Sequence, residues 1–205
     1  MQTTLQRQSS PSFKEWVSET FPLEQAYRAH RIERSLRKHL EGADTLLDCG
    51  SGSMRVAKLI ERRLGLKAYG TDVIHLKAGH TRFCLCAGEH LPFADNSFDV
   101  VTLMFVLHHT TDAAVAIKEC ARVARKRVVI LEDIYSHPLE KEWLKFLDVL
   151  GNFTISLDMP FPFTFKSVAE WERVFADLGL HLAASERIVP SPLRPSRHRL
   201  FLLEK

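Results

Sequence analysis

A glycine-rich turn follows a short apolar segment early in the chain. Thr45–Asp48 predicts a buried strand, Met54–Leu64 predicts a helix, and Gly50 and Gly52 lie between them. Glycines there let the backbone turn tightly and let a ligand approach it, and the helix start offers unpaired N–H groups. Asp72 ends the next predicted strand, 20 residues after Gly52 (72 − 52), where an acid can hydrogen-bond ribose hydroxyls. These residues predict a nucleoside-containing cofactor.

Two classes of cofactor use such a turn, and the neighbouring residues favour one of them. A dinucleotide site needs G-x-G-x-x-G, and Arg55 occupies the position of the last glycine. Asp48 at the strand end is unfavourable beside a pyrophosphate but suits a cationic ligand. S-adenosylmethionine (SAM), which carries a sulfonium and an ammonium group, fits better than a nicotinamide dinucleotide.

The region from about Thr45 to Lys126 resembles the class I SAM-dependent methyltransferases, and is most similar to small-molecule enzymes of the ubiquinone/menaquinone-biosynthesis type. Five segments match in the right order, which is more specific than any one motif. They are Asp48–Gly52, Gly70–Val73, the E-x-L-P-F-x-D-x-S-F-D run Glu89–Asp99, Val106–His109 and Glu119–Val123.

The resemblance implies an α/β fold: a Rossmann-like, mostly parallel seven-stranded sheet with helices on both faces and a C-terminal antiparallel hairpin. It also implies SAM as cofactor and a methyl acceptor bound nearby. The cofactor-binding residues expected from it are Asp48, Gly50, Ser51, Gly52, Asp72, Val73, Ala87, Gly88, Glu89 and Leu107.

The chain departs from the family pattern at three places. Met54 stands where a third glycine is common, which can change how the methionine part of SAM lies against the loop. Ala87 replaces an Asp that often binds the adenine amine, so we expect backbone near Ala87 and Gly88 to take that role. The usual Pro-Gly turn after Val123 is absent, which predicts a shortened loop before the fifth strand.

His108 and His109 follow the apolar run Asp99–Leu107, which predicts a central strand buried on both faces. Ligands bind at the carboxyl ends of such strands, and the two side chains are expected to point in opposite directions. Either histidine is a candidate general base, because imidazole titrates near neutral pH. The alternative is a structural role, because positioning supplies much of the acceleration of an in-line methyl transfer.

We divide the chain into one domain of four parts. Residues 1–41 form an N-terminal helical cap, 42–134 the cofactor-binding core, 135–166 a substrate-cap insertion, and 167–205 a last helix and hairpin. The insertion predicts a helix over Pro138–Leu150 and an aromatic segment after it that ends at Phe165. Its rings are either the wall of an apolar acceptor pocket or simple core. The helix face expected to be buried comprises Leu139, Trp143, Phe146, Leu147 and Leu150.

Composition limits the alternatives. The chain has 205 residues, 45% of them hydrophobic, and a formal charge of +3, which fits a single globular domain with no demand for an anionic partner. It contains no apolar run of the ~20 residues that a membrane helix needs, and its polar start leads us to expect no secretory signal. Four irregularly spaced cysteines suit a reducing cytoplasm. Cys84 and Cys86 would form a metal pair only with two further ligands nearby, and we expect them to be two ordinary thiols.

The predicted partner is a small, largely apolar acceptor, with no membrane, while the oligomeric state is not predicted. The alternatives are a SAM-binding regulatory module without catalysis and an RNA or protein methyltransferase. Nucleic acid is disfavoured because the Asn/Asp-Pro-Pro-Tyr/Phe motif and a Pro-Cys nucleophile are both absent. The basic residues from Arg28 to Lys38 have three interpretations: a solvated helix face, a binding surface for an anionic acceptor, or a nucleic-acid-binding surface.

Overall fold

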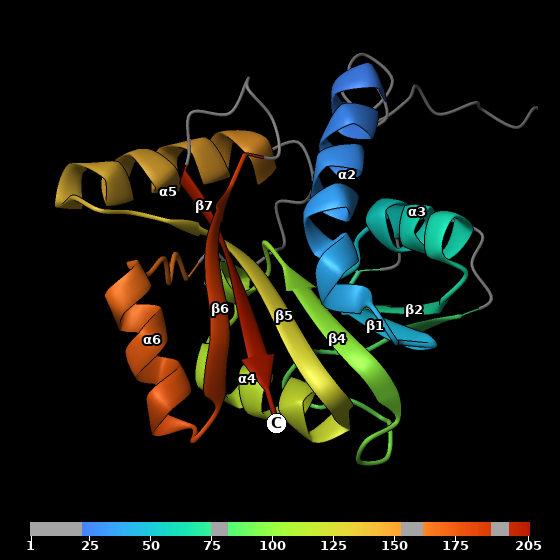
Figure 1. The fold of residues 1–205 in the computed structure, drawn as a ribbon. Coiled ribbons are helices and arrows are strands. Elements are labelled where there is room, and N and C mark those ends of the chain that lie inside the picture. The colour runs from blue at the N-terminus through green and yellow to red at the C-terminus, as the bar shows by residue number, and fades with distance from the viewer. Residues whose placement is uncertain (1–21, 75–81, 153–161, 190–196) are drawn as a thin grey trace, which may run out of the picture.

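Seven strands form one sheet in the computed structural model, which describes residues 22–74, 82–152, 162–189 and 197–205. The order is β3-β2-β1-β4-β5-β7-β6, with β7 antiparallel to both neighbours and the other pairs parallel (Figure 1). The mostly parallel α/β sheet with a C-terminal hairpin is therefore confirmed. The strands are β1 Thr45–Cys49, β2 Lys67–Asp72, β3 Phe83–Leu85, β4 Phe98–Met104, β5 Ala124–Ile134, β6 His181–Ile188 and β7 Arg197–Glu204.

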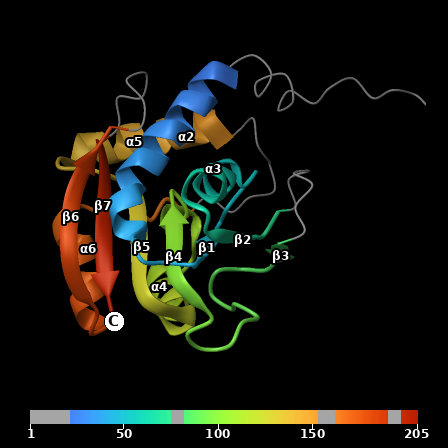
Figure 2. The ribbon, with the colours of Figure 1, turned by 45° about the vertical axis from the view of Figure 1, so that its right-hand side comes forward.

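Helices cover both faces of the sheet, as Figures 1 and 2 show. Helices α2 and α3 lie on one face and α4 and α6 on the other, while α5 crosses the edge where β4 and β5 end. The helices are α2 Pro22–Leu36, the 3-10 turn η1 Arg37–Leu40, α3 Arg55–Leu64, the 3-10 turn η2 Leu107–His109, α4 Ala113–Val123, α5 Pro138–Asn152 and α6 Val168–Asp177. None of the described helices is long and apolar enough to cross a membrane.

Alternate residues of the central strands enter two separate cores. In β4, Val101 and Leu103 pack with α4 and with Trp171 and Phe175 of α6, whereas Val100 packs on the opposite face with α2 and α3. A strand covered by helices on both faces is expected to be apolar at most positions. This explains the apolar run that the sequence shows there.

Strand β4 ends earlier than the sequence predicts, and this changes the direction of both histidines. Phe105 adopts a left-handed backbone with φ of 59°, and His108 and His109 lie beyond it in η2. The expectation that their side chains point in opposite directions is wrong, because strand alternation applies only to extended backbone. Their ring centroids lie 4.1 Å apart.

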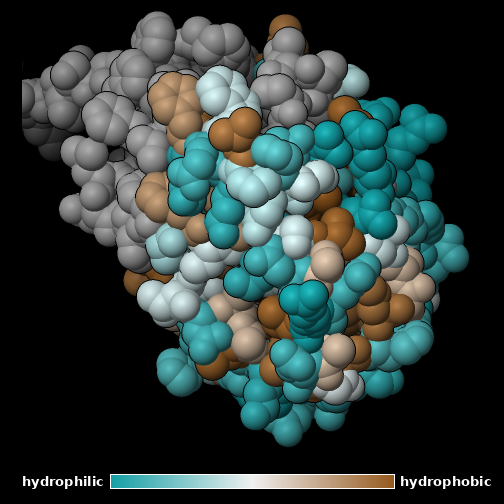
Figure 3. All heavy atoms as spheres, turned by 90° about the vertical axis from the view of Figure 1, so that its left-hand side faces the viewer, coloured by the Kyte–Doolittle hydropathy of each residue, from teal (hydrophilic) through white to brown (hydrophobic). Residues whose placement is uncertain are grey.

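Helix α5 buries a different face from the expected one and continues past Gly151. Leu144 is buried, whereas Leu139, Trp143 and Phe146 are 75%, 49% and 55% exposed. Residues four apart share a helix face, so the face that buries Leu144 also turns Asp148 toward the sheet. Figure 3, which views the molecule from the left-hand side of Figure 1, shows hydrophobic residues interspersed with hydrophilic ones.

The first described helix is part of the core as well as a cap. Ile32, Leu36 and Leu40 are buried with α3 against the sheet. The buried Glu33 binds Arg37 and Arg63 at 2.7 and 2.9 Å. In η1, which follows this helix, Lys38 pairs with Glu186 at 2.8 Å, so some of the basic side chains in this region are neutralised within the chain.

Several predicted features lie wholly or partly outside the described residues. They are the N-terminal tail, the helical stretch from Phe13 to residue 21, the start of the third strand at Thr81, and Phe153, Met159 and Phe161 of the aromatic segment. The direct connection between α4 and β5 is described, and it is as short as predicted: Ala124 caps α4 and begins β5.

Candidate functional site

The glycine turn follows β1 in the chain and is hydrogen-bonded to the carboxyl end of β2. The N–H groups of Gly50 and Ser51 donate to the Thr71 carbonyl at 2.8 and 2.9 Å. Gly50 has a φ of +75°, and a Cβ there would lie only 2.2 Å from a methyl carbon of Val106. Glycine is required at this position for two reasons, the left-handed backbone and the approach of the chain beyond β4.

The carboxylate of Asp72 holds the same turn. Its Oδ2 accepts the Gly52 N–H at 2.8 Å and its Oδ1 accepts the Ile74 N–H at 3.1 Å. A carboxylate oxygen can accept two hydrogen bonds. Each oxygen therefore keeps capacity for a ribose hydroxyl, and the role of Asp72 in binding ribose stays a prediction.

Asp48 is a buried carboxyl group beside this turn. Its side chain accepts one hydrogen bond, from the Thr102 hydroxyl at 2.9 Å, and no ion pair to it occurs in the described part of the chain. Burial raises the pKa of Asp48 to about 7. The hydrogen bond from Thr102 lowers this pKa in part, and the negative charge of Asp72 raises it further. A cationic ligand would supply the compensation that the described residues do not.

We expect SAM affinity to increase with pH through the titration of Asp48. A bound cation favours the carboxylate, so below the pKa of about 7 binding must release a proton. Affinity should rise about tenfold between pH 6 and pH 8 and then level off. Calorimetry in buffers of different ionisation enthalpy measures the released proton directly.

Asp48→Asn provides the matched comparison. This variant should bind SAM more weakly at pH 8 and lose the pH dependence. The raised pKa means that the folded state holds the proton more tightly than the unfolded state, so Asp48 reduces stability as pH rises from about 4 to 7. The Asn variant should lack that loss; an unchanged SAM affinity profile would disprove this role.

Met54, the departure from the third glycine, has a left-handed backbone with φ of 54° and forms the N-cap of α3. Its side chain is buried in the core with Leu46, Ala57 and Ile60. A Cβ on Gly70 would lie 2.8 Å from the Met54 sulfur. Met54 thus tolerates a backbone suited to glycine, and its side chain fills the core under the turn.

The other predicted cofactor residues lie around this turn in different environments. Ala87, Gly88 and Glu89 are half-buried, and a Cβ on Gly88 would lie 3.1 Å from the Cys49 sulfur, so this segment adjoins the end of β1. Val73 is exposed, whereas Leu107 is buried in the core. Their contacts with a cofactor stay predictions.

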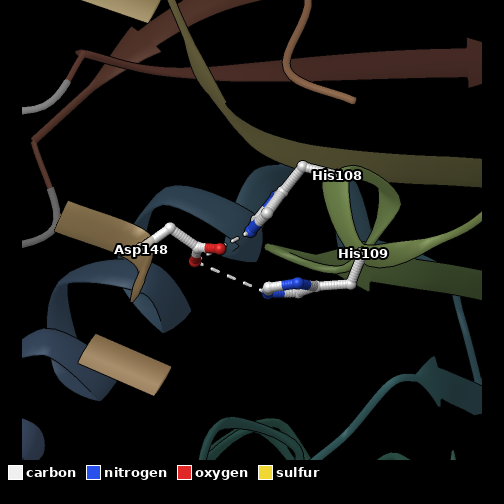
Figure 4. Close-up of side chains that lie close together, drawn as sticks. All are labelled: His108, His109 and Asp148. Atoms are coloured by element: carbon white, nitrogen blue, oxygen red, sulfur yellow. Dashed lines mark ion pairs between the residues drawn. The ribbon is translucent and has the colours of Figure 1, made fainter. Parts of the chain in front are cut away.

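A second cluster lies where β4 and β5 end, and it contains both predicted histidines (Figure 4). The Nδ1 of His108 lies 2.6 Å from Oε2 of Glu132, whose other oxygen accepts the N–H groups of Val106 and Leu107 at 2.8 and 2.7 Å. The Nε2 atoms of His108 and His109 each lie 3.6 Å from Oδ1 of Asp148. The cluster thus unites η2, β5 and α5.

Sequence reasoning missed Glu132 and Asp148. Glu132 had a signal, because a charged residue in the apolar run of β5 needs a buried partner. Asp148 had none, because its helix was expected to bury another face.

The two histidines differ in their protonation. Burial opposes the charge of His108, but Glu132 and Asp148 overcome it and raise the pKa to about 10. Burial lowers the pKa of His109, and the charge of His108 lowers it further. At neutral pH His108 is an imidazolium and His109 is neutral, so of this pair only His109 can accept a proton.

The end of the predicted insertion is attached to this cluster. The N–H and hydroxyl of Thr164 donate to the carbonyls of His108 and Leu107, at 3.2 and 3.1 Å. The ring of Phe165 stacks on His108 with centroids 4.6 Å apart. Residues 162–166 therefore lie beside the histidines, at the edge of the sheet predicted for the acceptor.

Comparison with known proteins gives consistent likenesses. The family described as a methyltransferase domain matches residues 47–131. The demethylmenaquinone methyltransferase of Mycobacterium marinum is 38% identical over 95 residues, 43% of this chain and 41% of that protein. The ubiquinone/menaquinone biosynthesis C-methyltransferase UbiE of Cupriavidus necator is 30% identical over 152 residues, 64% of this chain and 61% of that protein.

The match spans less than two thirds of each of these two relatives. A solved structure of similar fold is the 1,6-didemethyltoxoflavin-N1-methyltransferase of Burkholderia thailandensis, with 1,6-didemethyltoxoflavin and S-adenosylhomocysteine bound. It gives a TM-score of 0.70 at 14% identity and covers 94% of this chain and 86% of that one.

Proposed function

Because the chain belongs to the class I SAM-dependent methyltransferases, we propose that it transfers a methyl group from SAM to a small, largely apolar acceptor. The observation that carries this proposal is the buried carboxyl of Asp48, without an ion-pair partner in the described structure, beside the turn held by Asp72. When bound, SAM supplies a methyl group activated by its sulfonium.

The residues around the turn divide the binding between them. Asp48 compensates the positive charge of the ligand, and Gly50 and Gly52 let its polar tail approach the backbone. Asp72 accepts the ribose hydroxyls. We assign the adenine to the backbone of Ala87 and Gly88, next to the end of β1.

We place the acceptor between the turn and the cluster at the ends of β4 and β5. The half-buried Phe163 lies beside Thr164, which is bonded to the histidine turn, and an aromatic ring there would exclude water from an apolar body. His109 faces this region as the neutral imidazole, available to accept the acceptor's proton when no metal ion is present.

The four cysteines are free thiols, which fits our placement of the enzyme in a reducing cytoplasm.

A methyl-transfer assay with methyl-labelled SAM and a panel of phenols, enols and amines tests this function. His109→Ala should lower kcat by about 10²–10⁴-fold, the usual contribution of a positioned acid or base. SAM affinity should remain unchanged, because His109 is on η2 and outside the glycine turn. The exposed His181 provides the control, since His181→Ala removes an imidazole far from the cluster in sequence.

Equal kcat values for His109→Ala and wild type would contradict a catalytic role of His109. Binding of SAM with no transfer to any acceptor would instead favour a regulatory SAM-binding module. Transfer to RNA or protein alone would contradict the acceptor class. The ion pairs of Arg37 and Lys38 weigh against a nucleic-acid surface on η1.

A further inference from the structure

We propose that His108, His109 and Asp148 bind a divalent transition-metal ion at the acceptor side of the site. Each residue offers one ligand atom, and these atoms all lie within 4.8 Å of one another. Two imidazole nitrogens and a carboxylate oxygen suit zinc and neighbouring first-row ions better than Mg²⁺ or Ca²⁺, which prefer oxygen ligands. The sequence predicted no metal site, because Asp148 comes from a distant element.

The separations fit an ion better than they fit hydrogen bonds. Both Nε2 atoms lie 3.6 Å from Asp148 Oδ1, beyond the range of about 2.7–3.2 Å for a good hydrogen bond. A tetrahedral ion with bonds of about 2.0–2.1 Å holds its ligand atoms roughly 3.4 Å apart. A small inward rotation of the side chains, with release of the Nε2 proton of His108 to solvent, would therefore complete the coordination.

The rings are also held in the orientation that a ligand needs. Glu132 binds Nδ1 of His108, which directs Nε2 toward Asp148, and the ring is clamped against Phe165. A metal-binding histidine typically bonds its other nitrogen to such a carboxylate or carbonyl. The His108 side chain is only 3% exposed, while those of His109 and Asp148 are 17% and 12% exposed, which leaves access from one side.

Three protein ligands leave an open coordination position, as in catalytic rather than structural zinc sites. The next step rests on the proposed function: the ion would bind and orient an acceptor that carries an oxygen or nitrogen donor. His109 would then act as a ligand, and the ion would replace it in promoting loss of the acceptor's proton. The acceptor class narrows to molecules with a donor atom at the end of an apolar body.

The rival is an ion cluster without metal, in which His108 bridges Glu132 and Asp148. Titration of the full-length, chelator-treated protein with Co²⁺, without SAM, separates the two. We expect one equivalent to bind with a visible d–d spectrum. Asp148→Asn should weaken binding at least tenfold, whereas Glu142→Gln on the same helix, which removes an exposed carboxylate paired with Lys145, should not. His109→Gln tests a second ligand.

Thiols can also bind Co²⁺, so the combined variant Cys84→Ser, Cys86→Ser is included. If it retains the bound equivalent and the spectrum shows no sulfur-to-cobalt charge transfer, the ion is at the histidines. Lack of stoichiometric binding, or binding unaffected by both Asp148→Asn and His109→Gln, would overturn the proposal. SAM binding is measured separately, so a protein that binds SAM but not Co²⁺ would contradict the metal site alone.

Discussion

Glu132→Ala should destabilise the protein by about 3–5 kcal/mol, the usual cost of removing one partner from a buried ion pair. Glu132 is fully buried and accepts the N–H groups of Val106 and Leu107 as well as His108. Its loss leaves these donors unpaired in the core. Since a domain is stable by only about 5–15 kcal/mol, the change should be plain in denaturant unfolding.

Glu186→Ala is a suitable control. Glu186 also pairs with a histidine, His39 at 3.4 Å, and with Lys38, but its side chain is 33% exposed. Water replaces those partners, so the cost should be about 1 kcal/mol or less. Equal stabilities of the two variants would show that Glu132 does not organise the histidine turn.

The raised pKa of His108 gives a pH test of the same network. Its contribution to stability should be complete below about pH 6.5 and should be lost as pH rises toward 10. Glu132→Ala should reduce this alkaline loss, because Asp148 without Glu132 favours the imidazolium less strongly against burial.

Gly50→Ala should reduce SAM affinity at least about 100-fold, because a displacement of about 1 Å at a positioned site can cost that much. The added Cβ would lie 2.2 Å from Cγ2 and 2.8 Å from Cγ1 of Val106. One of the two segments must therefore move, and both border the proposed cofactor site. Calorimetric titration with SAM measures the loss.

Gly65→Ala isolates the effect of the contact from that of the backbone. Gly65 has a φ of +76°, nearly the same as Gly50, but a Cβ there meets nothing within 4 Å. It should cost about 1 kcal/mol of stability, the strain of a left-handed alanine, with SAM affinity unchanged. The double variant Gly50→Ala, Val106→Ala should recover part of the affinity; equal losses for Gly50 and Gly65 would contradict the role of the contact.

The elements around the proposed cofactor site were largely predictable from the sequence. Strands β1 and β2 are short and bounded by turns, so the elements that place Asp48, Gly50 and Asp72 follow from local patterns. The capping box Ser167–Glu170 also marked the start of α6 correctly. These features depend on neighbours in sequence, which is why they could be predicted.

The acceptor side depends on contacts between distant segments. The apolar run after Asp99 continues past the true end of β4, so the left-handed Phe105 and the turn η2 gave no signal. The buried face of α5 was mistaken because apolar residues occupy much of its circumference, and tertiary packing selects Leu144 and Asp148. The His–Glu–Asp cluster is therefore a product of the fold, beyond what periodicity predicts.

Titration of the wild-type protein with SAM, and in parallel with NADH, tests the central claim most directly. The account predicts one SAM site per chain at pH 8 and no saturable binding of NADH. It also predicts that SAM binding below about pH 7 releases a proton from Asp48. Absence of SAM binding, or preferential binding of NADH, would contradict the assignment of the glycine turn and with it the proposed methyltransferase function.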